Sequence, residues 1–184
     1  QTYDIVCTDL NGSTSSAPQQ VVLTDPSAIT ITFNGSFSNL NTKCKDSASA
    51  SIYFDVSNGV YPYTYSWNNS LTTTDSFALN LGAGDYKLYV VDSDGCRDSA
   101  SKTISEPDKL VLTATPNNAV CEGSSQLTLS ATGGPSPFKY KVKSKSTTYS
   151  VTNSYNSLDD ITNDTVYILD INNCRDTTTY SIPH

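Results

Sequence analysis

The chain has 184 residues, of which 36% are hydrophobic and 16% are charged, and its formal net charge is −7. This composition is typical of a globular protein, and no apolar run is long enough to span a membrane, so we expect no membrane insertion. An acidic surface repels phosphate backbones, which argues against nucleic acid as a partner.

Residues 1–26 open with a short run of alternating apolar residues that leads into a turn rich in Asn, Asp and Ser. The same plan returns at residues 84–98 and 164–176. The offset is nearly constant, because Cys44 and Cys121 are 77 residues apart and Cys96 and Cys174 are 78 apart. We therefore predict two whole repeats, residues 27–106 (repeat 1) and 107–184 (repeat 2), preceded by the C-terminal strands of a truncated repeat, residues 1–26.

Short runs with period-2 alternation predict the strands of repeat 1, which are residues 29–33, 50–56, 61–67, 75–81, 84–91 and 101–104. Repeat 2 follows the same plan with residues 110–114, 127–131, 138–145 and 164–170. Turn signals separate the runs and no helical period occurs, so the sequence predicts an all-β fold with an antiparallel sandwich of about seven strands in each repeat. The linker Glu106-Pro107-Asp108 is short and contains proline, which predicts a semi-rigid rod of tandem modules.

Five cysteines occur without the CxxC spacing of metal sites, which favours disulfides with one cysteine left over. Each whole repeat has one cysteine before its second strand and one after its turn. We therefore expect one disulfide in each repeat, Cys44 with Cys96 and Cys121 with Cys174. Such bonds persist in an oxidising compartment, which is the cell surface, the periplasm or the medium. Cys7 is expected either to be a buried thiol or to pair with a cysteine of the truncated repeat.

Aromatic residues alternate with small or polar ones in one predicted strand, at Tyr61, Tyr63, Tyr65 and Trp67. The face that they form is either the core, with Trp67 near a disulfide as in immunoglobulin domains, or a platform on which sugar rings stack. We favour the core, because the matching positions in repeat 2 are apolar and lie opposite a row of lysines. Tyr61 begins the strand and is therefore the candidate for exposure and ligand binding.

Tyr3 and Tyr86 each follow a turn at the start of a penultimate strand, which is typical of the tyrosine corner of β-sandwiches. Asp164 occupies this position in repeat 2, so there the corner is either missing or replaced.

Repeat 2 has the one concentrated basic feature, a row of lysines at Lys139, Lys141, Lys143 and Lys145. These lysines could bind an anionic surface polysaccharide. Equally, such a row is often the solvated face of an edge strand that is protected from aggregation, and this is the interpretation we favour.

The carboxylates of Asp92, Asp94 and Asp98 have a spacing that could hold calcium, although Asp residues also stabilise turns without metal. We expect no metal and no other cofactor. Nor does the sequence support an enzyme, since its one histidine is His184 and it has neither a phosphate-binding loop nor a nucleophile elbow.

Four segments of repeat 1 together resemble the SprB repeat: Gly59–Trp67, Leu81–Tyr86, Val91–Cys96 and Ile104–Pro107. Repeat 2 departs from this pattern, with Val142 in place of Trp67 and Asn172-Asn173-Cys174 in place of Asp94-Gly95-Cys96. SprB repeats occur in many copies in very large surface adhesins of gliding bacteria that the type IX system exports. The resemblance implies an immunoglobulin- or PKD-like sandwich with a role in adhesion or gliding. Asp46-Ser47-Ala48 and Asp98-Ser99-Ala100 also resemble the O-glycosylation signal of such bacteria, with Ser47 and Ser99 as acceptors.

The sequence therefore favours a non-catalytic segment of a large extracellular adhesin that acts as a stalk and presents a surface. Its expected partners are a surface polysaccharide or another extracellular surface, and the neighbouring repeats of the same chain. The alternative is a carbohydrate-binding accessory module of a secreted hydrolase.

Overall fold

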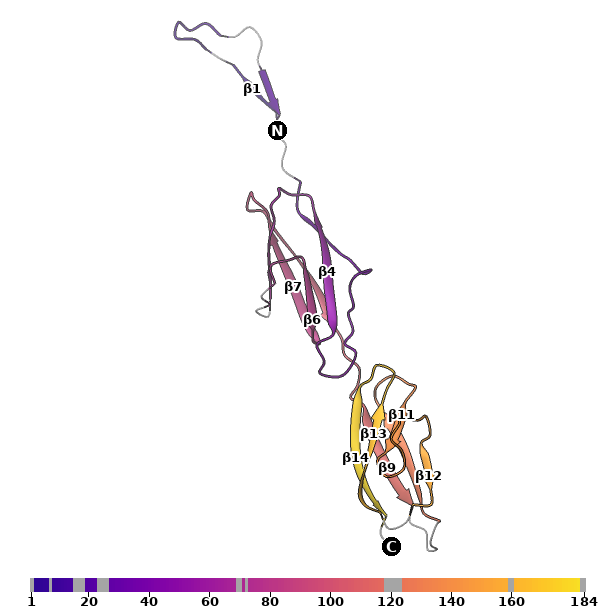
Figure 1. Ribbon diagram of the computed structural model, residues 1–184. Coiled ribbons are helices and arrows are strands. Elements are labelled where there is room, and N and C mark those ends of the chain that lie inside the picture. Colours follow the sequence, from indigo (N-terminus) through magenta and orange to yellow (C-terminus); the bar gives the residue numbers. More distant parts are fainter. Residues whose placement is uncertain are drawn as a thin grey trace.

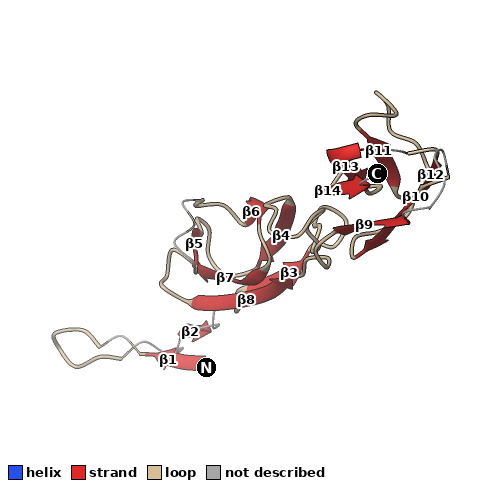
Figure 2. Ribbon diagram, turned by 90° about the horizontal axis from the view of Figure 1, so that it is seen from below, coloured by secondary structure: helices blue, strands red, loops and turns tan. Residues whose placement is uncertain are grey.

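The computed structural model describes residues 2–6, 8–14, 19–22, 27–68, 71, 73–117, 124–158 and 161–182. Within these residues the chain is all β, without a helix, and its paired strands are antiparallel (Figures 1 and 2). The first two strands, β1 (Thr2–Ile5) and β2 (Gln19–Val22), pair only with each other and lie apart from the rest of the molecule in Figure 1.

Repeat 1 contains two three-stranded sheets. One sheet has the order β3-β4-β6, and its strands are β3 (Thr30–Phe33), β4 (Ala50–Ser57) and β6 (Phe77–Leu81). The other has the order β5-β7-β8, and its strands are β5 (Thr64–Trp67), β7 (Gly84–Val91) and β8 (Arg97–Ile104).

Repeat 2 has the same strand order as repeat 1. Its first sheet, β9-β10-β12, contains β9 (Val111–Asn117), β10 (Gln126–Thr132) and β12 (Ser154–Asn156). Its second sheet, β11-β13-β14, contains β11 (Lys139–Val142), β13 (Ile161–Leu169) and β14 (Arg175–Ile182). The described residues of each repeat thus form six strands, where the sequence predicted about seven.

In the described residues, the buried apolar side chains form two separate hydrophobic cores. One takes its members from residues 29–104 and the other from residues 110–182, and each draws on both sheets of its repeat. The alternation that predicted the strands is the alternation that fills these cores. In β7, for example, Tyr86, Leu88 and Val90 are buried, as Val166 and Ile168 are in β13.

The third strand of each repeat is shorter than predicted. β5 begins only at Thr64, because the preceding residues form a bend that includes the cis peptide bond between Tyr61 and Pro62. β11 ends at Val142, whose carbonyl accepts hydrogen bonds from the backbone amides of Lys145 and Ser146 in a turn. Half of the predicted lysine row therefore lies in that turn rather than in a strand.

The tyrosine corner of repeat 1 is present: the Tyr86 hydroxyl donates a hydrogen bond to the Gly82 carbonyl at 3.2 Å. The side chain of Tyr3 lies outside the described residues. In repeat 2 the corner is replaced, because the hydroxyl of Tyr180, in the neighbouring strand, donates to Asp164 Oδ2 at 3.2 Å. Burial raises the pKa of Tyr180 to about 12, and the negative charge of Asp164 adds to this rise. Burial alone would also raise the pKa of Asp164, but hydrogen bonds from Ser144, Thr165 and Tyr180 outweigh it and hold that pKa below its usual value.

Strand directions decide which loops share an end of a repeat. We call the end where the first strand begins the leading end, and the end where the last strand finishes the trailing end. β4 and β7 run towards the leading end, while β3, β5, β6 and β8 run towards the trailing end. The loop before β4 therefore lies at the trailing end, and the turn between β7 and β8 lies at the leading end.

Candidate functional site

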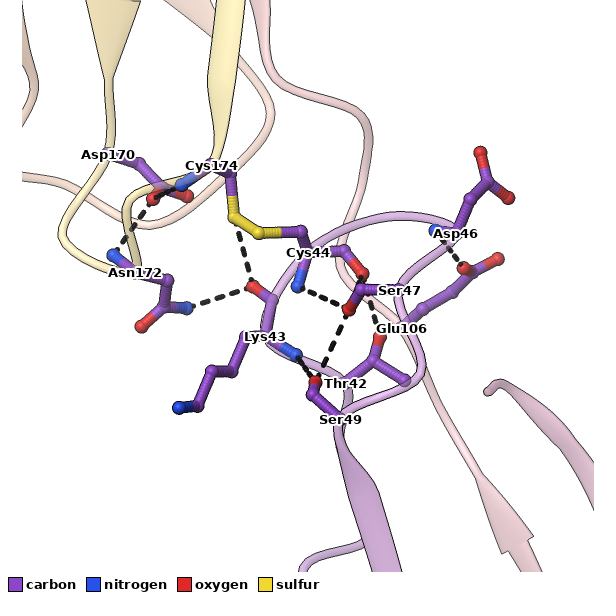
Figure 3. The surroundings of a disulfide bond; sticks show 10 residues. All are labelled: Thr42, Lys43, Cys44, Asp46, Ser47, Ser49, Glu106, Asp170, Asn172 and Cys174. Atoms are coloured by element: carbon purple, nitrogen blue, oxygen red, sulfur yellow. Dashed lines mark hydrogen bonds between the residues drawn. A yellow bond between two sulfur atoms is a disulfide. The ribbon is translucent and has the colours of Figure 1, made fainter. Parts of the chain in front are cut away.

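The described disulfide joins the two repeats and not the two halves of one repeat. Cys44, at the trailing end of repeat 1, is bonded to Cys174, at the leading end of repeat 2, with 5.6 Å between their Cα atoms (Figure 3). The predicted pairing of Cys44 with Cys96 and of Cys121 with Cys174 is therefore wrong. Cys96 is free and exposed. Cys121 and Cys7 lie outside the described residues.

Distance explains why Cys44 does not pair with Cys96. Cys96 immediately precedes β8, whereas the Cys44 loop contacts the residue that follows β8, because the Thr42 amide donates to the Ser105 carbonyl at 2.9 Å. A strand of eight residues spans about 26 Å. A disulfide requires Cα atoms within about 7 Å of each other, so the two cysteines of one repeat are too far apart.

Short hydroxyl side chains hold the loop that presents Cys44 (Figure 3). The Cys44 amide donates to Ser47 Oγ at 3.1 Å, and the Ser47 hydroxyl donates back to the Cys44 carbonyl at 2.8 Å. Ser49 Oγ accepts from the Lys43 amide at 2.8 Å, and the hydroxyl of Thr42, itself buried, donates to the Cys44 carbonyl at 2.9 Å. These hydrogen bonds lie within the loop, so they hold its shape independently of the disulfide to repeat 2.

The turn that presents Cys174 is shaped by a single carboxylate (Figure 3). Asp170 Oδ1 accepts hydrogen bonds from the backbone amides of Asn172 and Cys174, each at 2.8 Å. The Asn172 side-chain amide then donates across the junction to the Lys43 carbonyl at 3.1 Å, and Cys174 Sγ lies 3.2 Å from the same oxygen. One backbone carbonyl of repeat 1 is therefore held beside the bridge.

The linker is tied to repeat 1 by Glu106. Its carboxylate forms an ion pair with Lys45 and accepts the Asp46 amide at 2.8 Å. These contacts raise the pKa of Lys45 and lower that of Glu106, in each case chiefly through the hydrogen bond between the two side chains. Beside the linker, a hollow of about 390 Å³ lies between the trailing end of repeat 1 and the leading end of repeat 2. It is lined by Asn41, Thr42, Glu106, Pro107, Asp108, Gly133, Gly134, Pro135 and Asn172. We call the Cys44–Cys174 disulfide, the linker and this hollow together the junction.

The end of the linker and the residue that follows it, Lys109, pass very close to Gly133, since an added Cβ atom would lie 3.3 Å from the Asp108 carbonyl oxygen. A Cβ atom at this position would lie 2.0 Å from the Lys109 carbonyl oxygen, and its φ is +67°. The corresponding residue in repeat 1 is Asn58, which has a similar φ of 60° but carries a side chain. Glycine is therefore required here by contact with the linker as well as by conformation.

One buried side-chain atom at the junction has no hydrogen-bond partner among the described residues. In repeat 1, Asp92 Oδ2 accepts the Val60 amide at 3.1 Å. In repeat 2 the position of Val60 is taken by Pro135, which has no N–H, and Asp170 Oδ2 is buried without a partner. A buried oxygen without a hydrogen bond costs about 1–3 kcal/mol of stability. The carboxylate at the leading end of repeat 2 is therefore less completely hydrogen-bonded than the one at the leading end of repeat 1.

A second candidate site is a groove of about 450 Å³ on the sheet that contains β11, β13 and β14. It is lined by Lys141, Tyr149, Tyr167, Arg175, Asp176 and Thr177. Lys141 Nζ lies 5.0 Å from the centre of the Tyr167 ring and 5.7 Å from that of Tyr149. Lys141 beside two aromatic rings, with Arg175 lining the same groove, is an arrangement suited to a sugar that carries an acid group.

Of the four lysines predicted as a possible binding row, only Lys141 lines this groove. Lys139, Lys143 and Lys145 are exposed, and Lys145 Nζ donates to the Ser157 carbonyl at 3.1 Å. β11 is indeed an edge strand. Arg175 and the two tyrosines were missed; Tyr167 could have been found, because it alternates with the inward Val166 and Ile168 and must therefore face outward.

The aromatic strand divides as predicted between core and surface. Trp67 is buried, packs against Phe54 and donates from Nε1 to the Asp75 carbonyl at 3.0 Å. Tyr61 is 80% exposed. The core around Trp67 contains no cysteine among its described members, whereas Cys44 packs against the core of repeat 2, so the expected contact between Trp67 and a disulfide is wrong.

The aspartates considered for calcium do not converge on one point. Both Asp92 carboxylate oxygens accept backbone amides, while Asp94 and Asp98 are exposed. In the described part of the chain, no three His, Cys, Asp or Glu side chains form a group that could hold a metal ion. Of the two serines considered for glycosylation, Ser99 is exposed, whereas the Ser47 hydroxyl is engaged in the Cys44 loop.

Comparison with known proteins gives matches in shape but not in sequence family. No protein-family model matches the chain, and no curated protein matches it. Among solved structures, similarity is found to a C-terminal 282-residue fragment of intimin in complex with the translocated intimin receptor (Tir) intimin-binding domain, at 13% identity and a TM-score of 0.41 over 88% of this chain. The chain spans 65% of that fragment, which is less than two thirds of its length.

Two further structures have a similar shape. PcdhgB3 EC1-4 matches at 11% identity and a TM-score of 0.39, over 98% of this chain and 63% of the other. DIP-gamma IG1+IG2 matches at 15% identity and a TM-score of 0.37, over 84% of this chain and 97% of the other. These scores are low, so function has to be argued from the residues of this chain. No helix in the described residues is long and apolar enough to cross a membrane.

Proposed function

We propose that the chain is a non-catalytic repeat segment of a large extracellular adhesin that takes part in surface adhesion and gliding motility, as its resemblance to SprB repeats implies. Residues 27–106 and 107–184 are tandem immunoglobulin- or PKD-like β-sandwich modules, and residues 1–26 are the end of a further module. The modules hold distance as a stalk and present their faces to an extracellular surface. Export by a type IX system belongs to the same proposal.

The observation that carries this proposal is the disulfide between the trailing end of repeat 1 and the leading end of repeat 2. A catalytic protein gains little from a covalent bond between the tips of two small units that share no core. A stalk gains resistance to bending and to extension at the point where it is weakest. Two separate cores with the same strand order support the modular part of the proposal.

The same bond supports an extracellular location, because disulfides persist where the surroundings are oxidising. The partners proposed are a surface polysaccharide or another extracellular surface, together with the neighbouring repeats of the chain. No cofactor is needed for either role.

Labelling of intact cells tests this proposal. Antibodies raised against the chain are expected to stain intact source cells without permeabilisation, and their monovalent fragments are expected to reduce attachment of the cells to a surface. Antibodies against a cytoplasmic protein of the same cells serve as the control. Staining that requires permeabilisation, or staining with unchanged attachment and gliding, would contradict the proposal.

The alternative function, a carbohydrate-binding accessory module of a secreted hydrolase, is favoured by the groove at Lys141. If this alternative holds, the chain binds acidic polysaccharides on a glycan array, and Lys141→Ala weakens binding about tenfold or more, because it removes a charge between two aromatic rings. Lys139→Ala is the matched control, since this exposed lysine of the same strand lies outside the groove. Binding that disappears with Tyr61→Ala would instead place the sugar at the leading end of repeat 1. Absence of binding to any acidic glycan would exclude this alternative and leave the stalk.

A further inference from the structure

The disulfide between the repeats joins two positions that each occur twice in the chain. Cys44 stands in the loop before the second strand of repeat 1, and Cys121 stands at the same place in repeat 2, each followed three residues later by a serine. Cys174 stands in the turn before the last strand of repeat 2, and Cys96 stands in the matching turn of repeat 1. A bond between a loop cysteine and the turn cysteine of the next repeat is therefore a pattern that can continue along the chain.

The turn that presents Cys96 has the same construction as the turn that presents Cys174. Asp92 Oδ1 accepts the amides of Asp94 and Cys96 at 3.0 and 2.8 Å, as Asp170 Oδ1 accepts those of Asn172 and Cys174. The amide of each aspartate donates in return to the carbonyl of its cysteine, at 3.0 Å in repeat 1 and 3.2 Å in repeat 2. The two sulfur atoms are thus held in the same way at the leading end of each repeat.

What differs between the two turns is what covers them. Cys174 is only 8% exposed, because the Cys44 loop of repeat 1 lies on it, whereas Cys96 is exposed. Tyr61 is also exposed, and the residue before it is tied to the Cys96 turn, because the Ser93 amide donates to the Val60 carbonyl at 3.0 Å. The matching segment of repeat 2, Gly133–Pro135, lines the junction hollow together with residues of repeat 1. In the described part of the chain, the leading end of repeat 1 is therefore left open where that of repeat 2 is docked.

We propose that Cys96 is the bridging site for the Cys44-type loop of a preceding repeat, so that every junction in a longer array carries the bond seen between Cys44 and Cys174. Cys121 has the complementary role at the trailing end of repeat 2. This inference depends on the tandem-module part of the proposed function but not on adhesion. One contact does not carry over, because Asp94 takes the place of Asn172 and cannot donate to the carbonyl beside the bridge.

The bond forms by two exchange steps with a small-molecule disulfide such as oxidised glutathione. The thiolate of one cysteine attacks a sulfur of that disulfide, a mixed disulfide forms, and one reduced thiol leaves. The second cysteine thiolate then attacks the protein sulfur of the mixed disulfide and releases the second reduced thiol. The two protein thiols are oxidised, one small disulfide is reduced to two thiols, and their two protons pass to the leaving thiolates.

A tandem chain tests the inference. A second copy of residues 27–106 is inserted between Pro26 and Ser27 of the whole chain, and this copy carries Cys96→Ser so that a single Cys96 remains. After oxidation in glutathione buffer, free thiols are alkylated and identified by peptide mass. In the original chain we expect alkylation of Cys96. In the tandem chain we expect this alkylation to fall about tenfold or more, because a tethered loop presents its thiol at a millimolar effective concentration.

Two matched variants assign the partner. Cys44→Ser in the inserted copy is expected to restore alkylation of Cys96, whereas Cys44→Ser in the original copy should expose Cys174 and leave Cys96 protected. The inference is wrong if Cys96 stays reactive while the bond between Cys44 and Cys174 forms in the same molecules, or if Cys96 is found bonded to Cys7 or to a second chain. If the bond between Cys44 and Cys174 is absent from the original chain, the junction itself is wrong. None of these outcomes depends on whether the protein adheres to anything.

Discussion

Pulled from its two ends in oxidising buffer, the chain is expected to stop short of full extension by about 450 Å, because 130 residues separate the bonded cysteines along the sequence. Force that enters repeat 1 reaches Cys44, crosses the disulfide and leaves through the last strand of repeat 2. The intervening segment contains most of both cores, and the bond shields it from tension. Single-molecule force extension, with handles at the two termini, measures the difference directly.

Two cysteine variants distinguish the effect of losing the Cys44–Cys174 disulfide from the effect of replacing any cysteine. Cys44→Ser in oxidising buffer is expected to extend as far as the parent chain does in reducing buffer. Cys96→Ser should behave as the parent, because Cys96 is free in this chain. An oxidised parent that extends to the same length as Cys44→Ser would show that the two repeats are not bridged.

Gly133→Ala is expected to destabilise repeat 2 by about 2–5 kcal/mol. This is the sum of the cost of a left-handed backbone conformation for alanine and the cost of displacing the adjacent linker segment. The added methyl group would collide with the Lys109 carbonyl oxygen, a backbone atom that cannot rotate away. Urea unfolding measures the loss. Trp67 is the only tryptophan and is buried in repeat 1, so its fluorescence should keep its midpoint while the tyrosine signal of repeat 2 shifts.

Gly95→Ala is the matched control for this experiment. Gly95 has a similar positive φ of +85°, but no atom lies within 4 Å of the added Cβ. We expect a loss of only about 1–2 kcal/mol, seen in the Trp67 transition of repeat 1. Equal losses for the two variants would mean that the close approach of the linker to Gly133 does not constrain repeat 2.

Most strands could be predicted from the sequence because their burial alternates with a period of two. β7 and β13 show the reason, since Leu88, Val90, Val166 and Ile168 are fully buried and their neighbours face outward. The third strands were predicted too long. The alternation continues through Tyr61 and Tyr63 and through Lys143 and Lys145, but the backbone bends at the first pair and turns at the second. Side-chain patterns alone do not report where such a bend begins.

The disulfide could not be predicted because pairing depends on which end of a repeat each cysteine occupies. In a simple up-and-down arrangement, the turn with Cys96 would lie at the same end as Cys44. In the structure β5 and β6 run in the same direction, so the turn after β7 lies at the opposite end. The crossing segment between β5 and β6 carries no sequence signal for this reversal. Arg175 was missed for a similar reason, because only the folded sheet places it beside Lys141.

The bond between Cys44 and Cys174 also changes what a protease can do to this chain. Hydrolysis of one peptide bond anywhere between these cysteines opens a ring and does not release a fragment, because both new ends stay attached through the sulfur atoms. Exposed loops such as residues 93–96 and 143–148 fall inside this ring. A filament built in this way tolerates a nick in any such loop and is shortened only by two cuts, or by reduction followed by one.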